Sequence, residues 1–206
     1  MKTLIIGATG GIGGALARLW AGQGEVWLTG RRLEALSALA GELGARALPL
    51  DLGNELEVAS LLEEVGPLDR LIYAAGAVVR TPLRSTPRDG LEEVLAANFL
   101  GAFFALKHAR LSPGAKALFL GAYPAYVEVP GFAAYAASKQ ALESLLNTAR
   151  KEWRREGVQL ILVRLPAVDT PLWGPLGGAP RGALSPEEAA RRILAGLEGG
   201  GEVLEL

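Results

Sequence analysis

The sequence predicts an α/β fold in which a mostly parallel sheet of seven strands carries helices on both faces. Short β-rich runs alternate with longer amphipathic runs along the 206 residues, and this alternation is typical of βαβ units. The predicted strands are almost continuously apolar, as expected for parallel strands that are buried on both sides. No linker or internal repeat divides the chain, so we expect one domain over residues 1–206.

The predicted elements alternate from the first residues to the last. Strands are expected at residues 3–6, 25–29, 45–50, 70–74, 115–120, 158–164 and 202–206. Helices are expected near residues 11–22, 32–43, 54–65, 88–110, 132–156 and 186–198. The last helix has a clear start, because Ser185 can cap it, Pro186 suits its first turn and Glu188 can complete a capping box.

The least regular stretch is 167–183, which contains three prolines and four glycines. It follows a predicted strand and should therefore emerge at the carboxyl edge of the sheet, where open α/β proteins bind ligands. We interpret it as a short lid or substrate loop. The alternative is a merely flexible connection.

Composition excludes several classes of site and partner. The chain has no cysteine and a single histidine, His108, so disulfides and cysteine or histidine metal sites are excluded and we expect no metal. A formal net charge of -1 lacks the excess of positive charge that is typical of nucleic-acid-binding proteins. No apolar run approaches the ~20 residues of a membrane helix. The first residues enter a strand without a signal-peptide core, so a cytoplasmic location is expected.

A glycine-rich run lies between the first predicted strand and the first predicted helix. It reads Gly7-Ala8-Thr9-Gly10-Gly11-Ile12-Gly13-Gly14. Glycine permits a tight turn and lets backbone N–H groups approach a pyrophosphate at a helix N-terminus. Inside a βαβ unit this pattern predicts a Rossmann-type dinucleotide site. The alternative is an ordinary strand-to-helix turn.

Tyr135 and Lys139 lie four positions apart in a segment that is predicted to be helical. One turn brings both side chains to the same face. A nearby cation favours the phenolate, so we expect Tyr135 to exchange a proton below the pKa of ~10 of a free phenol. The pair therefore suggests a general acid/base. The alternative is a half-buried phenol beside a solvated amine.

Together, Gly7-x-x-x-Gly11-x-Gly13 and Tyr135-x-x-x-Lys139 resemble the short-chain dehydrogenase/reductase family, and the resemblance covers nearly the whole chain. It implies that Asp51 and Leu52 contact adenine and that Asn98 relays protons toward Lys139. Further cofactor contacts are implied for Gly7, Thr9, Gly10, Gly11, Ile12, Gly13, Ala74, Ala75, Gly76, Tyr135, Lys139, Val168 and Thr170. Ala74-Ala75-Gly76 resembles the tail of the family's Asn-Asn-Ala-Gly motif without its asparagines.

In the family mechanism, tyrosine moves the proton while hydride passes between the nicotinamide and the substrate carbon. The resemblance thus assigns the proton transfer to Tyr135. It implies that Lys139 binds the hydroxyls of the nicotinamide ribose and lowers the pKa of Tyr135. Asn98 follows Leu91, Val94 and Leu95 on an apolar stripe, where a polar group must find a partner. The alternative for Asn98 is a structural hydrogen bond.

One family residue is missing. A serine thirteen positions before the tyrosine orients the substrate oxygen in relatives, and this chain has Ala122 there. Three interpretations remain open. Tyr123 could supply a substitute hydroxyl, the enzyme could be slow or use a substrate with its own donor, or the protein could bind cofactor without turnover.

The end of the second predicted strand indicates which cofactor is used. It reads Leu28-Thr29-Gly30-Arg31-Arg32, with no acid to accept hydrogen bonds from the ribose of NAD, whereas arginine suits the 2′-phosphate of NADP. NADP(H) is therefore predicted. The alternative is that both arginines are solvated, and the family's other NADP mark, a basic residue in the glycine loop, is absent.

These observations predict an NADP(H)-dependent oxidoreductase that acts on a small-molecule carbonyl or alcohol. The alternative is a non-catalytic NADP(H)-binding redox sensor or regulatory protein. Relatives pair their two long helices across a twofold axis, here near 88–110 and 132–156. The resemblance thus implies a homodimer or homotetramer.

Overall fold

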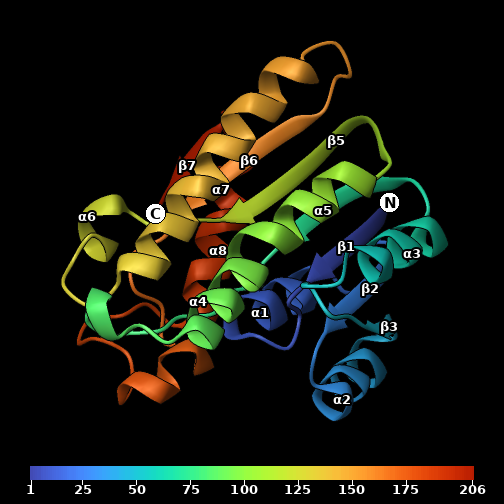
Figure 1. The fold of residues 1–206 in the computed structure, drawn as a ribbon. Coiled ribbons are helices and arrows are strands. Elements are labelled where there is room, and N and C mark those ends of the chain that lie inside the picture. The colour runs from blue at the N-terminus through green and yellow to red at the C-terminus, as the bar shows by residue number, and fades with distance from the viewer.

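A seven-stranded sheet forms the centre of the computed structural model, which describes residues 1–206 (Figure 1). The strand order is β3-β2-β1-β4-β5-β6-β7, and every neighbouring pair is parallel. The predicted doubly wound α/β fold is therefore confirmed. The strands are β1 Lys2–Ile6, β2 Glu25–Gly30, β3 Arg46–Pro49, β4 Leu68–Tyr73, β5 Leu111–Leu120, β6 Gln159–Arg164 and β7 Val203–Glu205.

Helices cover both faces of the sheet. Their bounds are α1 Gly11–Trp20, α2 Leu33–Leu43, α3 Glu55–Val65, α4 Arg88–Leu95, α5 Gly101–His108, α6 Pro124–Val127, α7 Ala133–Glu152 and α8 Pro186–Gly196. In Figure 1, α5 and α7 lie in front of the sheet and α8 lies behind it. No helix is both long enough and apolar enough to cross a membrane.

Alternation along the strands divides the core into two layers. Ile5 packs in a cluster with residues of α1, α2 and α8, whereas its neighbours Leu4 and Ile6 pack with residues of α3, α5 and α7. Successive side chains of a strand point to opposite faces, so each central strand supplies both layers. This burial on both sides explains why the strands are continuously apolar.

The helix predicted over 88–110 is interrupted. The chain forms α4, a π-helical turn at Ala96–Leu100 (η2) and then α5. Apolar spacing does not distinguish an α-helix from one containing a π turn, so the sequence pattern could not reveal the interruption. Two 3₁₀ helices, η1 Leu83–Ser85 and η3 Pro171–Leu176, and the short helix α6 were not predicted either.

Details at the starts of β5 and α8 differ from the prediction. Strand β5 begins at Leu111 rather than 115, because its pairing with β4 shifts register between Leu68 and Arg70 and so accommodates Pro113 and Gly114. At the start of α8, the Ser185 hydroxyl accepts a hydrogen bond from the Glu188 backbone N–H at 3.1 Å, as predicted. The Glu188 carboxylate instead binds arginines of α8, so the capping box is only half formed.

Candidate active site

A cavity of about 930 Å³ lies at the carboxyl edge of the sheet. This volume is at the upper end of the ~300–1,000 Å³ typical of small-molecule sites. The loops that follow β1, β2, β4, β5 and β6 all contribute to its wall. The cavity therefore spans the point between β1 and β4 at which the strand order reverses, where doubly wound sheets bind ligands.

The glycine loop forms the floor of this cavity by close backbone packing. Gly7 has a φ of +86°, and a Cβ there would lie 2.5 Å from the Ala75 backbone nitrogen. A Cβ at Gly13 would lie 2.3 Å from the Gly7 carbonyl oxygen, and one at Gly11 would lie 2.7 Å from Thr170 Cγ2. Any larger residue at these positions would force the loop apart, which explains their glycines.

Helix α1 begins at this loop without a side-chain cap and without an acidic residue in its first turn. The first backbone N–H groups of a helix have no partner within it. Together with the positive end of the helix dipole, they form a site that suits an anion. The loop and the start of α1 therefore fit the pyrophosphate of a dinucleotide cofactor.

The arginines after β2 lie at one end of the cavity, and both line it. The Arg31 guanidinium pairs with the Glu93 carboxylate of α4 at 3.1 Å, and Arg32 donates a hydrogen bond to the Thr9 carbonyl. A Cβ at Gly30 would lie 2.9 Å from Thr9 Oγ1, so the glycine loop closely abuts the end of β2.

Of the predicted adenine contacts, only Leu52 lines the cavity. The Asp51 carboxylate lies in the following turn, where it accepts a hydrogen bond from the Gly53 backbone N–H at 2.9 Å. Gly13 and Asn98 are likewise outside the wall. The other predicted site residues all line it: Gly7, Thr9, Gly10, Gly11, Ile12, Arg31, Arg32, Ala74, Ala75, Gly76, Tyr135, Lys139, Val168 and Thr170.

Tyr135 and Lys139 lie one turn apart on α7 and are both 8% exposed. The Lys139 ammonium lies 5.6 Å from the centroid of the Tyr135 ring and donates a hydrogen bond to the Leu120 carbonyl at 2.9 Å. An ammonium has three donors, so two remain for other acceptors. The predicted common face is confirmed.

The expected lowering of the Tyr135 pKa is not found in this geometry. Burial raises the pKa of Tyr135 to about 12, and burial also lowers the pKa of Lys139 to about 8. Desolvation disfavours the charged form of each group. Burial of the phenol is therefore the physical reason why the expected lowering does not occur.

The Asn98 side chain is fully buried in the π-helical turn and its contacts tie three segments together. Its Oδ1 accepts a hydrogen bond from the Ala77 backbone N–H at 3.0 Å. Its Nδ2 donates to the Ala77 carbonyl and to Ser138 Oγ, both at 2.9 Å. The Asn98 side chain therefore makes structural hydrogen bonds, as the alternative to a proton relay expected. A relay of protons from Asn98 toward Lys139 stays a prediction.

Gly76 lies between Asn98 and Lys139. A Cβ at this position would come within 3.1 Å of Asn98 Oδ1 and 3.9 Å of Lys139 Nζ. The absence of a side chain lets the segment after β4 pass between the buried amide and the ammonium. This packing explains the glycine that ends Ala74-Ala75-Gly76.

The structure corrects the interpretation that Tyr123 replaces the missing serine. Ala122 lines the cavity, but Tyr123 does not. The Tyr123 hydroxyl instead donates a hydrogen bond to the Leu206 carbonyl at 3.1 Å, because neighbouring residues of an extended segment point to opposite sides. Tyr126 of α6 does line the cavity. Sequence reasoning missed it because α6 was not predicted.

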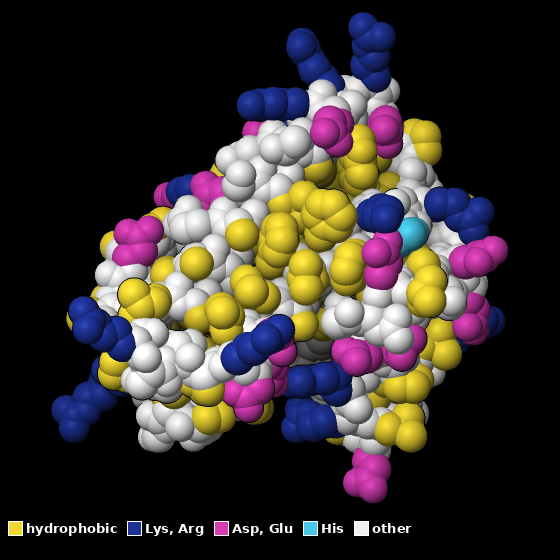
Figure 2. All heavy atoms as spheres, in the orientation of Figure 1, with side chains coloured by type: hydrophobic (Ala, Val, Ile, Leu, Met, Phe, Trp, Pro, Cys, Tyr) yellow, Lys and Arg dark blue, Asp and Glu magenta, His cyan; other side chains and the backbone are white.

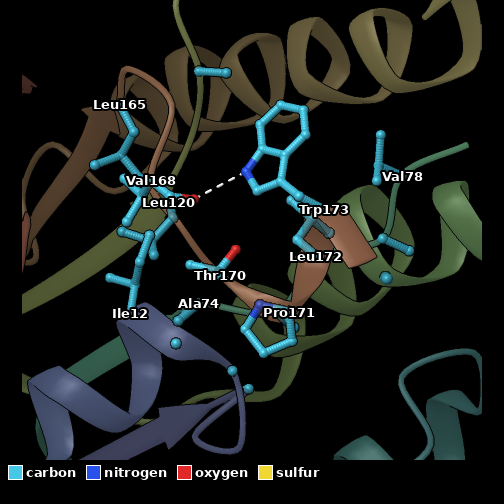
Figure 3. A pocket seen from close by; sticks show the side chains of 18 of the residues that line it. Ile12, Ala74, Val78, Leu120, Leu165, Val168, Thr170, Pro171, Leu172 and Trp173 are labelled. Atoms are coloured by element: carbon cyan, nitrogen blue, oxygen red, sulfur yellow. Dashed lines mark hydrogen bonds between the residues drawn. The ribbon is translucent and has the colours of Figure 1, made fainter. Parts of the chain in front are cut away.

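The loop over 167–183 also lines the cavity. It is closed by a bridge between Val168 and Leu184 and contains η3, from which the Trp173 Nε1 donates a hydrogen bond to the Val168 carbonyl at 2.9 Å. Figure 3 shows Thr170 and Pro171 near the start of α1 and the Trp173 ring across the cavity. Leu172 and Trp173 of the loop, together with Val78, form an apolar part of the cavity wall.

Comparisons with known proteins all point to the same protein family. A family model described as short chain dehydrogenase matches residues 2–179. Glycine betaine reductase ATRR of Emericella nidulans is 31% identical over 220 residues, which cover 94% of this chain but only 17% of that relative. This chain therefore corresponds to a small part of that protein.

Two crystal structures extend the comparison. One, from Thermus thermophilus and assigned by name to the short-chain oxidoreductases, is 60% identical with a TM-score of 0.92 and covers 100% of both chains. An alcohol dehydrogenase from Thermococcus sibiricus, complexed with 5-hydroxy-NADP, is 27% identical with a TM-score of 0.86. That match covers 100% of this chain and 94% of the other. Because the family model spans well over half of the sequence, this protein belongs to the short-chain dehydrogenase family of oxidoreductases.

Proposed function

We propose that the protein transfers hydride between NADP(H) and a carbonyl or alcohol substrate, with Tyr135 as the general acid/base. The observation that carries this proposal is the arrangement of one cavity, with the glycine loop at its floor and Tyr135 and Lys139 in its wall. The bound nicotinamide would supply or accept the hydride. The residues of the chain bind the cofactor, orient the substrate and move the proton.

With its pKa raised to about 12 by burial, Tyr135 is protonated at neutral pH. A buried phenol that keeps its proton can donate it to the alkoxide that develops on the substrate. The two remaining Lys139 donors suit the ribose hydroxyls, and contact there would hold the ammonium close to Tyr135. The protonated phenol and the two free ammonium donors suit the proton-donating role that carbonyl reduction requires.

The apolar wall indicates the substrate class. Val78, Val127, Val129, Leu172 and Trp173 line the cavity. Such side chains favour an apolar aldehyde or ketone over a charged one. We therefore propose that 167–183 acts as a short lid or substrate loop over this group.

A second function is favoured by one observation. Ala122 offers no hydroxyl to the substrate, and the Tyr123 hydroxyl is bound to Leu206, so a non-catalytic NADP(H)-binding sensor or regulatory protein is the competing proposal.

The purified protein should be titrated with NADPH and then assayed for NADPH consumption over a panel of apolar aldehydes and ketones. Tight binding with no consumption above the substrate-free background would contradict the enzyme proposal.

Replacing Arg31 with alanine tests the cofactor assignment. Hydrogen bonds to charged groups contribute about 1.5–3 kcal/mol, so Arg31→Ala should weaken NADPH binding about 10- to 100-fold by calorimetry. NADH lacks the 2′-phosphate, and its affinity should change by less than about threefold. Arg88→Ala, which removes an arginine of α4 outside the cavity, is the control. Equal losses for NADPH and NADH would contradict the NADP(H) assignment.

An exposed apolar surface supports the proposed homo-oligomer. Leu91, Leu100 and Phe103 are 38%, 37% and 41% exposed on the segment that runs from α4 through η2 to α5. Figure 2 shows hydrophobic side chains gathered across this face of the molecule. Contiguous apolar surface of this kind marks interaction sites.

Phe103→Glu is expected to convert the proposed oligomer into monomers, because it places a charge on the apolar surface that the proposed contact would bury. Size-exclusion chromatography with light scattering measures the change. Leu56→Glu, on the exposed side of α3 at a residue that is 77% exposed, should leave the mass unaltered. A monomeric wild-type protein at micromolar concentration would contradict the oligomer.

A further inference from the structure

The ion pair between Arg31 and Glu93 joins two elements that are distant in the sequence. Arg31 follows β2, Glu93 belongs to α4, and the two residues are 62 positions apart. Arg31 Nη1 lies 3.1 Å from Glu93 Oε1, and both side chains line the cavity. The pair therefore lies at the same end of the cavity as the proposed 2′-phosphate site.

Glu93 is the single carboxylate among the residues that line the cavity. The cationic residues in the same wall are Arg31, Arg32, Lys139 and Arg181. Arg32 and Lys139 already donate hydrogen bonds to the carbonyls of Thr9 and Leu120. Glu93 is thus the single negative charge in a wall that carries four positive charges, and it pairs with the arginine that the proposed function assigns to a phosphate.

A carboxylate and a phosphate bind a guanidinium through the same donors, often through two parallel hydrogen bonds. Arg31 and Glu93 are 64% and 55% exposed, and an exposed pair of this kind is weak and readily exchanged. A phosphate monoester carries up to two negative charges. It can therefore displace the Glu93 carboxylate, but it then lies beside a group of the same sign.

We propose that Glu93 is a specificity-determining residue that competes with the 2′-phosphate of NADPH for Arg31. It holds Arg31 before the cofactor binds and repels the phosphate afterwards, so it lowers the preference for NADPH over NADH. NADH carries no 2′-phosphate and leaves the Arg31–Glu93 pair intact. This inference rests on the proposed function, because it requires Arg31 to contact the 2′-phosphate.

The test compares two glutamate-to-glutamine variants that are adjacent on α4. Glu93→Gln removes the competing charge and should tighten NADPH binding about two- to tenfold, while NADH affinity changes less than twofold. Glu92→Gln removes the same charge one residue earlier, where Glu92 pairs with Arg88 at 2.7 Å and does not line the cavity. It should leave both affinities unaltered. Dissociation constants are measured by isothermal titration calorimetry at low and high salt.

The gain in Glu93→Gln should shrink at high salt, because exposed charges are screened over ~10 Å at 0.1 M salt and ~3 Å at 1 M. Unchanged or weaker NADPH binding in Glu93→Gln overturns the inference, as does an equal gain in Glu92→Gln. If the wild type also prefers NADPH and loses that preference in Arg31→Ala, the proposed function survives this failure. If Arg31→Ala has no selective effect, the cofactor assignment itself fails.

Discussion

Lys139→Met is expected to reduce carbonyl turnover about 10²- to 10⁴-fold, the usual contribution of acid–base machinery, while making the folded protein more stable. The stability effect arises because the charge is buried. The ammonium is buried, and its pKa is lowered to about 8 from an ordinary 10.5. Turnover is measured as NADPH consumption, and stability is measured as the free energy of unfolding in urea.

The stability gain follows from the proton balance. Between about pH 8 and 10.5, the unfolded chain holds the Lys139 proton and the folded chain does not, so wild-type stability should rise with pH across this window. Below about pH 8 the buried charge costs about 3 kcal/mol. Methionine removes this cost but also the hydrogen bond from the charged ammonium to the Leu120 carbonyl, which contributes about 1.5–3 kcal/mol. A net gain of up to about 1.5 kcal/mol is therefore expected at pH 7.

Tyr135→Phe is the matched control. It removes the proton donor but leaves Lys139 in place, so turnover should fall while the rise in stability above about pH 8 remains. Tyr135 has a raised pKa, so its own contribution lowers stability only above about pH 10, outside the measured window of about pH 7–9.5. A pH-dependent rise that persists in Lys139→Met would contradict the assignment of that rise to Lys139.

Ala122→Ser is expected to raise kcat about 10²- to 10³-fold, the inverse of the loss seen when one donor to a developing oxyanion is deleted. Ala122 is partly buried and lines the same cavity as Tyr135. A serine hydroxyl there could reach the substrate oxygen. NADPH affinity should not change, because the new group acts on the substrate.

Ala125→Ser provides the control for this gain. Ala125 also lines the cavity but lies on α6, beyond the end of β5. The serine at 125 adds the same hydroxyl at a different place and should leave kcat unaltered. The gain of Ala122→Ser should disappear when it is combined with Tyr135→Phe. An inactive Ala122→Ser protein that still binds NADPH would favour the sensor or regulatory function.

Local signals in the sequence were sufficient for much of the site. The glycine loop depends on a few adjacent residues between one strand and one helix, and Tyr135 and Lys139 depend only on the period of a helix. These features were therefore predictable without the fold. The order of strands and helices was predictable for the same reason, because each element carries its own apolar pattern.

Features that depend on tertiary contacts were not predictable. Glu93 reaches Arg31 only because α4 is brought beside the end of β2. The substitute role considered for Tyr123 was wrong because its hydroxyl binds the Leu206 carbonyl, 83 positions away in the sequence. The Tyr135 pKa is raised by burial, and the burial of this phenol does not follow from its spacing to Lys139.

The position of Trp173 gives the protein a built-in optical reporter. The chain has four tryptophans, and Trp173 alone lines the cavity. Trp20 and Trp27 are buried in the core, and Trp153 packs at the edge of the layer that contains α7. A reduced nicotinamide absorbs light where tryptophan emits, so its arrival should quench the emission of Trp173 most strongly. Cofactor binding can therefore be followed by fluorescence in the native protein, without an attached dye.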